Sequence, residues 1–409
     1  MPLQRLTEIL KEQVSDMEDK GTAKCAELVV TGITPPRGNR GPRFRLAGGG
    51  ETEFIRMNSN SYLGMSLRPE VVRAGEEGTA TYGAGPGAVR CISGTYQVHV
   101  ELERALAAFH RRPVAMLFSS AYAATLGTLV PLITGETAII SDELNHNCII
   151  NAIRLSRPRE KVIYPHLDMD ALERALVEMK GRVKRALVVT DGIFSMRGDH
   201  APMDRIMEMA RRHDEDYPEN VVVVMDDSHG VGAFGDTGRG TEEYTSSPPA
   251  DILLGTLGKA LGVNGGYVAS EPHLIRFLRE SAPLYIYSNP ITPGEASAAL
   301  ASLRILDSPE GRELLARLRS LTRRFEAGIQ ALGMETIIGE HPVVPLMIRD
   351  TGRTRALVKH LYANGILATG LAHPIVPRGD EKIRFQINAD HTEEDLDRVL
   401  DALGTFQGG

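Results

Sequence analysis

Between Phe54 and Ser288 the sequence alternates between short apolar runs and longer amphipathic segments. The apolar runs have the length of strands and no polar alternation, which is typical of strands buried on both faces. Such strands need a layer of helices on each side of the sheet, and the intervening segments have helical length and spacing. This alternation therefore predicts an α/β fold with a mostly parallel sheet. The runs are "AMLFSS", "TAIISD", "RALVVTDG", "NVVVVMDD" and "ADILLGT", and the segments include "DMDALERALVEMK" and "APMDRIMEMARRH".

The regions before and after this segment differ from it in residue pattern and composition. Apolar residues at helical spacing predict an amphipathic helix over residues 3–17, and an arm rich in glycine, proline and arginine follows over residues 31–53. We read this arm as irregular, with at most a short strand at its end. After Pro290 a long helical stretch leads to short strands and a final helix from Thr392, which indicates a smaller α+β domain. The expected division is a helix and arm over 1–53, a large domain over 54–290 and a small C-terminal domain over 291–409.

Composition excludes several classes of protein. The net charge of −7 argues against a dedicated nucleic-acid binder, and the longest apolar runs are far shorter than a membrane span. The N-terminal residues include acidic side chains and have no continuous apolar core, unlike a signal peptide. Cys25, Cys91 and Cys148 are widely spaced, so neither a disulfide framework nor a metal site is indicated. We therefore expect a reduced, cytoplasmic protein.

Polar residues follow several of the predicted strands at the point where each strand ends. In open α/β sheets, ligands bind outside the carboxyl ends of the strands. We therefore expect these residues to converge on one site. They are Ser119, Ser120, Asp142, Asp191, Asp226, Asp227 and Thr256.

A single lysine, Lys259, lies in the glycine-rich and otherwise apolar stretch "DILLGTLGKALG". A desolvated lysine has a lowered pKa, and its neutral amine can form a Schiff base. Upstream, "VVVVMDDSHG" places Asp226 at the end of a buried strand with His229 three residues later. A pyridine nitrogen would give this carboxylate a partner, and the bound aspartate would keep the ring protonated. The alternatives are a solvent-reaching loop lysine and an aspartate that caps a turn before Gly230.

Two further stretches fit the same cofactor, pyridoxal phosphate. "SDELNHNCII" places His146 at a strand-to-helix junction, where it would stack on a ring; a helix-capping or core histidine is the alternative. "FSSAYAATLG" predicts a strand end that opens a helix, and the free N–H groups of a helix start bind phosphate. Thr256, three residues before Lys259, offers a hydroxyl to the same phosphate.

Several motifs together resemble the α-oxoamine synthase family, whose members are pyridoxal-phosphate enzymes of fold type I. They are "TDGIFSMRGDHAPM", "DDSHGVGAFGDTGRG", "GTLGKALG" and "YIYSNPITP", and their order and spacing agree with the family from about Phe54 to the C-terminus. Within the family, "AIISDELNHNCIINAIRLS", "GRGTEEY" and "HPIVPRGDEKIRFQINADHT" most resemble the 2-amino-3-ketobutyrate CoA ligases, or glycine C-acetyltransferases.

The resemblance implies roles for individual residues. Lys259 would carry the Schiff base, Asp226 would pair with the ring nitrogen, and His146 would stack over the ring. His229 and Ser195 would lie near the phenolic oxygen of the ring. Ala121, Tyr122 and Thr256 would hold the phosphate. Ser288 would reach the phosphate of the partner subunit. Arg384 and Asn60 would bind the substrate carboxylate.

The resemblance also implies an activity and an assembly. The enzyme would condense an amino acid, glycine, with an acyl-CoA, release CoA and give an α-amino ketone, working as a homodimer with shared active sites. Departures from the ligase pattern leave the acyl donor and the amino acid open. They include Ala121-Tyr122 in place of Cys-Phe and the arm over residues 31–50. The arginines of this arm would either meet CoA phosphates or belong to a solvated segment. A larger acyl donor or another amino acid, as in an 8-amino-7-oxononanoate synthase, is the alternative.

Three rival interpretations remain. The first is another pyridoxal-phosphate reaction on the same fold, such as transamination or aldol cleavage. The second is an inactive structural partner subunit, but such a subunit would be expected to lose Lys259 or Asp226, and both are present. The third is a nucleotide-binding Rossmann protein, for which the sequence lacks G-x-G-x-x-G between an early strand and a helix.

Overall fold

The computed structural model describes residues 3–23 and 27–407, so Cys25 lies outside the described residues. The chain forms two compact units. The first unit comprises Met1–Ser59, Leu321–Gly339 and Val343–Gly409, and the second comprises Asn60–Ser320 and Glu340–Pro342. The domain boundaries expected from the sequence, after residues 53 and 290, remain a prediction. In the described part of the chain, each helix is too short or too polar to span a bilayer.

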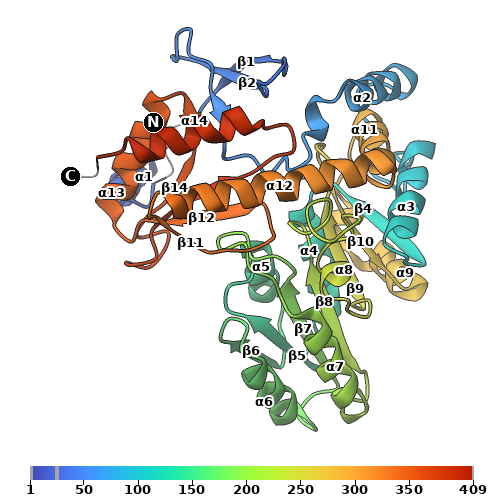
Figure 1. The fold of residues 1–409 in the computed structure, drawn as a ribbon. Helices are drawn as coiled ribbons and strands as arrows, with labels where there is room; N and C mark the ends of the chain where they lie inside the picture. Colours follow the sequence, from blue (N-terminus) through green and yellow to red (C-terminus); the bar gives the residue numbers. More distant parts are fainter. Residues whose placement is uncertain (1–2, 24–26, 408–409) are drawn as a thin grey trace. The chain divides into compact units, whose positions relative to one another are not determined.

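The second unit is built on a seven-stranded sheet (Figure 1) with the order β4-β10-β9-β8-β7-β5-β6. The strands β9, β8, β7, β5 and β6 run parallel, and β10 is antiparallel to both of its neighbours. The predicted, mostly parallel sheet is therefore confirmed. The strands are β4 (Val114–Phe118), β5 (Thr137–Asp142), β6 (Glu160–Tyr164), β7 (Arg185–Asp191), β8 (Val221–Asp226), β9 (Ile252–Thr256) and β10 (Gly266–Ser270).

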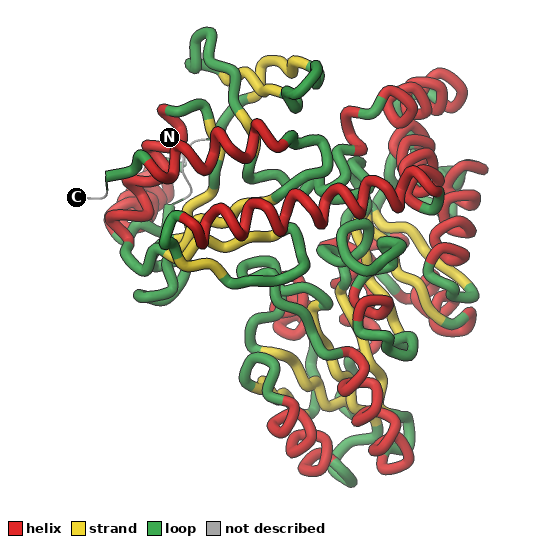
Figure 2. The backbone as a smooth tube through the Cα atoms, viewed as in Figure 1, coloured by secondary structure: helices red, strands yellow, loops and turns green. Residues whose placement is uncertain are grey.

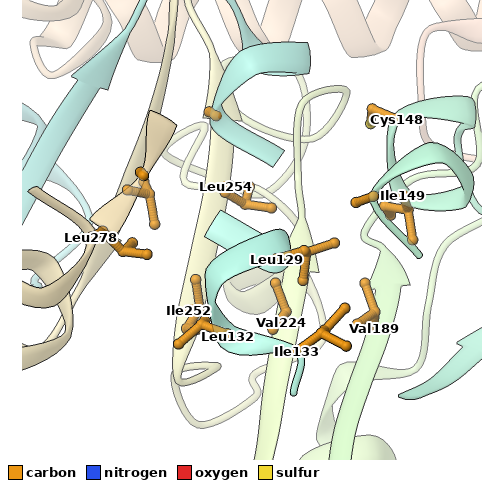
Figure 3. Close-up of a cluster of buried hydrophobic side chains, with 14 of the residues drawn as sticks. Leu129, Leu132, Ile133, Cys148, Ile149, Val189, Val224, Ile252, Leu254 and Leu278 are labelled. Atoms are coloured by element: carbon orange, nitrogen blue, oxygen red, sulfur yellow. The ribbon is translucent and has the colours of Figure 1, made fainter. Parts of the chain in front are cut away.

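Helices flank this sheet (Figure 2), as its apolar strands require. Figure 3 shows side chains of the helical segments, such as Leu129 and Ile149, against Val189, Val224 and Leu254 of the strands. The residues that alternate with them along the strands are buried as well, so both faces of the sheet are covered. The helices are α2 (Pro69–Tyr82), α3 (Gln97–Phe109), α4 (Ala121–Leu132), α5 (Asn147–Leu155), α6 (Met169–Met179), α7 (Met203–His213), α8 (Thr241–Tyr244), α9 (Pro272–Ser281), α10 (Pro283–Ile286) and α11 (Pro293–Leu306).

The first unit contains a small antiparallel sheet with the order β11-β12-β15-β14. Its strands are β11 (Glu335–Thr336), β12 (Val343–Met347), β14 (Thr369–Leu371) and β15 (Lys382–Gln386), and its helices include α1 (Gln4–Asp19), α13 (Thr351–Ala363) and α14 (Glu393–Gly404). A parallel pair, β3 (Ile55–Arg56) with β13 (Ile366–Leu367), belongs to the same unit. Helix α12 (Pro309–Ala331) contributes its first part to the second unit and its remainder to the first.

The arginine-rich arm is more regular than the sequence suggests. Strands β1 (Val30–Thr34) and β2 (Arg43–Leu46) pair antiparallel within it. Arg43 is buried and forms an ion pair with Asp395, which also accepts a hydrogen bond from the Gly41 main-chain N–H at 3.0 Å. Asp395 closes a capping box with Thr392 at the start of α14. Arg43 therefore holds the arm to its own unit and is not exposed for contact with CoA phosphates.

A buried carboxylate orders the loop that follows β8. Asp227 is fully buried, and its two oxygens accept hydrogen bonds from the main-chain N–H and the hydroxyl of Thr241, at 2.8 Å and 2.6 Å. A Cβ atom at Gly192, Gly230 or Gly240 would lie within 2.2 Å of this carboxylate. Glycine is therefore required at these positions because the backbone closes around Asp227. Burial raises the pKa of Asp227 to about 7.

We predict that the two aspartates of α14 differ sharply in their contribution to stability. Asp395→Ala leaves Arg43 as a buried, unpaired charge and should lower the free energy of unfolding by about 3–5 kcal/mol. Asp397→Ala removes an exposed pair with Arg324 and should cost only about 0–1 kcal/mol. Urea titrations of the two variants and the wild type measure both values. Equal losses would contradict the structural role of Asp395.

Asp227→Asn tests the carboxylate under the loop. Because the pKa in the folded state is raised, the ionised group is disfavoured by folding, and its contribution to stability falls as pH rises from about 4 to about 7. Asparagine does not titrate. The stability of the wild type relative to the variant should therefore decrease over this window, by at most about 1.4 kcal/mol per pH unit, and stay constant above it. Parallel stability curves from pH 4.5 to 8 would show that Asp227 is not perturbed.

Candidate active site

The carboxyl ends of β7, β8 and β9 surround a cavity of about 200 Å³ in the second unit. The ends of these strands meet because they are parallel, and Asp191 and Asp226 are register partners on β7 and β8. The predicted convergence of polar strand ends is thus observed for Asp191, Asp226 and Thr256. The lining residues are Ala121, Tyr122, His146, Cys148, Asp191, Ile193, Ser195, Asp226, Ser228, His229, Thr256 and Lys259.

Asp226 ends β8 and is buried, yet donors surround its carboxylate. One oxygen, Oδ2, accepts a hydrogen bond from the Thr125 hydroxyl at 3.1 Å and a weaker one from the Cys148 thiol at 3.7 Å. The other, Oδ1, accepts from the Ser228 main-chain N–H at 3.1 Å. These donors compensate for the loss of water and leave a fixed, partnered acceptor at the cavity wall. The sequence analysis did not identify Thr125, one helical turn into α4.

Asp191 lies beside Asp226, as its register partner on β7. Burial, together with the neighbouring charge of Asp226, raises the pKa of Asp191 well above its ordinary value. The shift favours the protonated form of Asp191. One of its oxygens accepts the main-chain N–H of His146 at 2.9 Å.

His146 is the N-cap residue of α5, so the capping role considered as an alternative is present. Its Nδ1 accepts the main-chain N–H of Cys148 at 3.3 Å. Burial lowers the pKa of His146, the nearby charge of Lys259 lowers it further, and Asp226 offsets part of this shift. The imidazole is therefore neutral at pH 7. Capping through Nδ1 fixes the ring at the cavity wall, where His146 is a lining residue.

His229 is held by two aromatic side chains that the sequence analysis did not identify. The hydroxyl of Tyr62 lies 2.7 Å from His229 Nδ1, and Nε2 of His341 lies 2.9 Å from the His229 carbonyl oxygen. Tyr62 and His341 are both buried. Burial lowers the pKa of His341 to about 4, so this ring is neutral and donates to the carbonyl. Tyr62 lies two residues after Asn60 in "NSNSYLG", a stretch in which a role was predicted only for Asn60.

The part of the cavity lining at the start of α4 is suited to an anion. Helix α4 begins at Ala121, after the N-cap Ser120, and the N–H groups of its first turn have no partner within the helix. Ala121 and Tyr122 line the cavity together with Thr256. A Cβ atom at Gly266 of β10 would come within 2.3 Å of the Ala121 nitrogen, so the close approach of β10 to the helix start requires glycine there. A helix start beside a hydroxyl favours phosphate.

The residues present fit pyridoxal phosphate. The half-buried Lys259 provides an amine, Asp226 a carboxylate, and the start of α4 a phosphate site, all on one cavity. The Ser228 hydroxyl also lines the cavity, and among the described residues it has no hydrogen-bond partner, which leaves it available to a ligand. Across residues 3–23 and 27–407, no group of three or more His, Cys, Asp and Glu side chains is placed to hold a metal ion.

Three predicted residues are not part of this lining. Ser288 follows α10 and is half-buried, outside the set of lining residues. Asn60 is the first residue of the second unit, and its buried side-chain oxygen has no partner among the described residues. Arg384 lies on β15 in the first unit. The contacts implied for these three residues remain predictions.

Comparison with known proteins gives one consistent family. Residues 52–403 match the aminotransferase class I and II family. The chain is 37% identical to the 8-amino-7-oxononanoate synthase of Geobacter sulfurreducens, over 97% of each chain. It is 38% identical to the mitochondrial 2-amino-3-ketobutyrate coenzyme A ligase of Homo sapiens, over 98% of this chain and 92% of that one. A solved structure of SPT, a serine palmitoyltransferase, with pyridoxal phosphate (PLP) is 26% identical to this chain. Its TM-score is 0.85, over 98% of this chain and 97% of that one.

These likenesses confirm the predicted family, the fold class and the cofactor. They extend over nearly the whole chain, so they include both the large parallel sheet and the smaller antiparallel one. The cavity at the strand ends supplies the groups that pyridoxal phosphate needs. The chain belongs to the aminotransferase class I and II family, and within it to the α-oxoamine synthases, which are pyridoxal-phosphate-dependent acyltransferases of fold type I.

Proposed function

We propose that this enzyme condenses glycine with an acyl-CoA, releases CoA and yields an α-amino ketone. The observation that carries the proposal is the convergence of Lys259, Asp226 and His146 on one cavity. An amine, an acceptor for a ring nitrogen and a neutral imidazole are the groups that such a condensation needs from the protein. The similarity to a 2-amino-3-ketobutyrate CoA ligase supports the choice of substrates.

When bound, pyridoxal phosphate supplies an electron-withdrawing ring that stabilises negative charge at the substrate Cα. Asp226 would hold the ring nitrogen, and the hydrogen bonds from the Thr125 hydroxyl and the Ser228 main-chain N–H orient its carboxylate. The first turn of α4 and Thr256 would hold the phosphate. Ser195 and His229 would contact the phenolic oxygen, and the hydrogen bond between the Tyr62 hydroxyl and Nδ1 helps to orient the His229 ring.

Lys259 Nζ is the proposed base. It lies on the same cavity as Asp226 and close enough to His146 to affect its pKa. In its neutral form the amine can take a proton from the substrate Cα and return it later. The neutral His146 can stack over the ring and donate a hydrogen bond to the carbonyl oxygen of the acyl group. Its lowered pKa means that His146 does not place a second positive charge beside Lys259 at pH 7.

The remaining substrate contacts and the assembly are also proposals. Arg384 would bind the amino-acid carboxylate through two parallel hydrogen bonds, with Asn60 nearby. A homodimer would place Ser288 at the phosphate of the partner subunit, and the exposed Tyr287 beside it offers an aromatic surface to that subunit. We also propose a cytoplasmic location, which the free thiols of Cys91 and Cys148 support.

A second candidate has equal support from the comparisons. The 8-amino-7-oxononanoate synthases match this chain over nearly its full length, with identities like those of the ligases. A larger acyl donor or a different amino acid is therefore the alternative. The Ala121-Tyr122 departure from the ligase pattern lies at the cavity itself, and Tyr122 is 40% exposed there. Tyr122 is therefore suited to discriminate between acyl groups at the rim of the cavity.

Replacing Lys259 with alanine should lower kcat by about 10²–10⁴-fold, because the base is lost. The visible absorbance of the bound cofactor should change at the same time, because the Schiff-base partner is gone. Lys161→Ala, at an exposed position on β6, is the matched control and should behave as the wild type. Turnover and absorbance that both survive in Lys259→Ala would refute the site.

A substrate panel should separate the two candidates. Free thiol released from CoA is measured with glycine or alanine, each combined with acetyl-CoA or a longer acyl-CoA. We expect the highest kcat/KM for glycine with a short acyl-CoA. A preference for alanine with a long acyl-CoA would favour the second candidate. Amino-acid-dependent product without CoA release would instead indicate transamination or aldol cleavage.

A further inference from the structure

A histidine outside the cavity lies between two carboxylates. His166 follows β6, and its side chain is 14% exposed. Its Nδ1 lies 3.0 Å and 3.2 Å from the two carboxylate oxygens of Asp142, at the end of β5. Its Nε2 lies 3.3 Å from the Asp199 carboxylate, which belongs to the loop after β7. The ring of Phe194 packs edge-on against the imidazole, with 4.4 Å between centroids.

The carboxylate of Asp142 orders the loop that leads to His146. Its Oδ1 accepts the main-chain N–H of Leu144 at 2.8 Å, and its carbonyl oxygen accepts that of Asn145 at 3.3 Å. His146 is the next residue. The carboxylate of Asp142, which has no exposed side-chain surface, therefore sets the path of the chain into the cavity wall.

Asp199 orders a second loop. Its carboxylate accepts Nε of Arg197 at 2.7 Å, and its carbonyl oxygen accepts the main-chain N–H of Phe194 at 2.9 Å. Ile193 and His200 close this loop as a bridge pair. Ser195, which lines the cavity, lies at its centre. The two carboxylates that flank His166 thus belong to the two loops that carry His146 and Ser195.

Proton accounting fixes the state of the imidazole. A neutral imidazole has one N–H donor and one lone pair, so it can donate to only one of the two carboxylates. Its second nitrogen would then turn a lone pair toward an ionised oxygen at about 3 Å, which is repulsive. Only the doubly protonated ring donates in both directions.

We propose that His166, as an imidazolium, is a positioning residue that joins the loop before His146 to the loop bearing Ser195. The spacing of these two residues across the cavity then depends on a proton on His166. The proposal rests on the roles given above to His146 and Ser195 at the cofactor.

The charges around His166 agree with this state. Burial alone would lower the pKa of His166, but the hydrogen bonds to Asp142 and Asp199 outweigh it and raise the pKa to about 9. The other titratable or charged groups that face the cluster are Glu143, which accepts the His166 main-chain N–H, Tyr164, Asp191, Arg197 and His200. With a pKa of about 9 in the folded state, the ring keeps its second proton at pH 7, and the bridge is lost as pH rises through about 9. Its contribution to stability is fully present below the unfolded pKa of about 6.5 and falls between about 6.5 and about 9.

The test combines two measurements on the holoenzyme between pH 6 and 10. The first is an NMR titration of the histidine ring signals, with His166 assigned from H166Q. The second is the dissociation constant of pyridoxal phosphate, measured from its absorbance. We expect His166 to titrate near pH 9, and H166Q to bind the cofactor about 10-fold more weakly at pH 7 because a charged hydrogen bond is lost.

Two further variants decide the matter if H166Q folds poorly. D199N keeps the ring but removes one carboxylate, so it should shift both the titration of His166 and the alkaline loss of cofactor affinity to lower pH. H213Q is the control: His213 also lies between carboxylates, 3.2 Å from Asp216 and 3.6 Å from Glu173, near the amino end of β8 and away from the cavity. H213Q should leave cofactor affinity unchanged.

Three results would overturn the proposal. They are titration of His166 at or below pH 6.5, an alkaline limb that D199N does not shift, and an effect of H213Q equal to that of H166Q. None of these readouts uses acyl transfer, so they remain separate from the Lys259→Ala and substrate experiments that test the proposed function.

Discussion

A buried carboxylate with a fixed set of donors is the interaction on which the site depends. Asp226 ends a strand in the middle of the sheet, where burial removes it from water. Hydrogen bonds from Thr125, Cys148 and the Ser228 main chain surround its two oxygens. The strand order of the sheet brings these donors together, because α4 and α5 both begin at the carboxyl edge where β8 ends. The fold therefore supplies the electrostatic partner that a pyridine nitrogen requires.

Burial favours the neutral forms of the neighbouring titratable groups. It raises the pKa of Asp191 and lowers those of His146 and His341. Asp226 and the positive helix start of α4 line the same cavity. His166 behaves in the opposite way, since two carboxylates keep it charged outside the cavity wall.

Much of the fold and part of the site were predictable from local sequence. The apolar runs ending in Asp142, Asp191 and Asp226 predict parallel strands, and parallel strands place these ends on one edge. Strand β10 was not predicted, because "GYVAS" is short, begins with glycine and pairs antiparallel only through the tertiary fold. The pairing of β1 with β2 was also missed, because the ion pair of Arg43 with Asp395 joins residues far apart in the chain.

The site residues that the sequence did not predict were missed for the same reason, because their partners are far away in the chain. Tyr62, Thr125 and His341 carry no motif of their own, and only the folded chain brings them to His229 and Asp226. Cys148 was noted only as one of three spaced cysteines, although it follows the predicted His146 by two residues. Short motifs thus indicated the groups that would touch the cofactor, while the residues that hold those groups in place came from distant segments.

The most direct measurement of the central claim is chemical trapping of the cofactor on the protein. The holoenzyme is reduced with borohydride, digested and mapped by mass spectrometry. The account predicts one pyridoxyl group per chain, on the peptide that contains Lys259. A pyridoxyl group on another lysine, or none on any peptide, would contradict it.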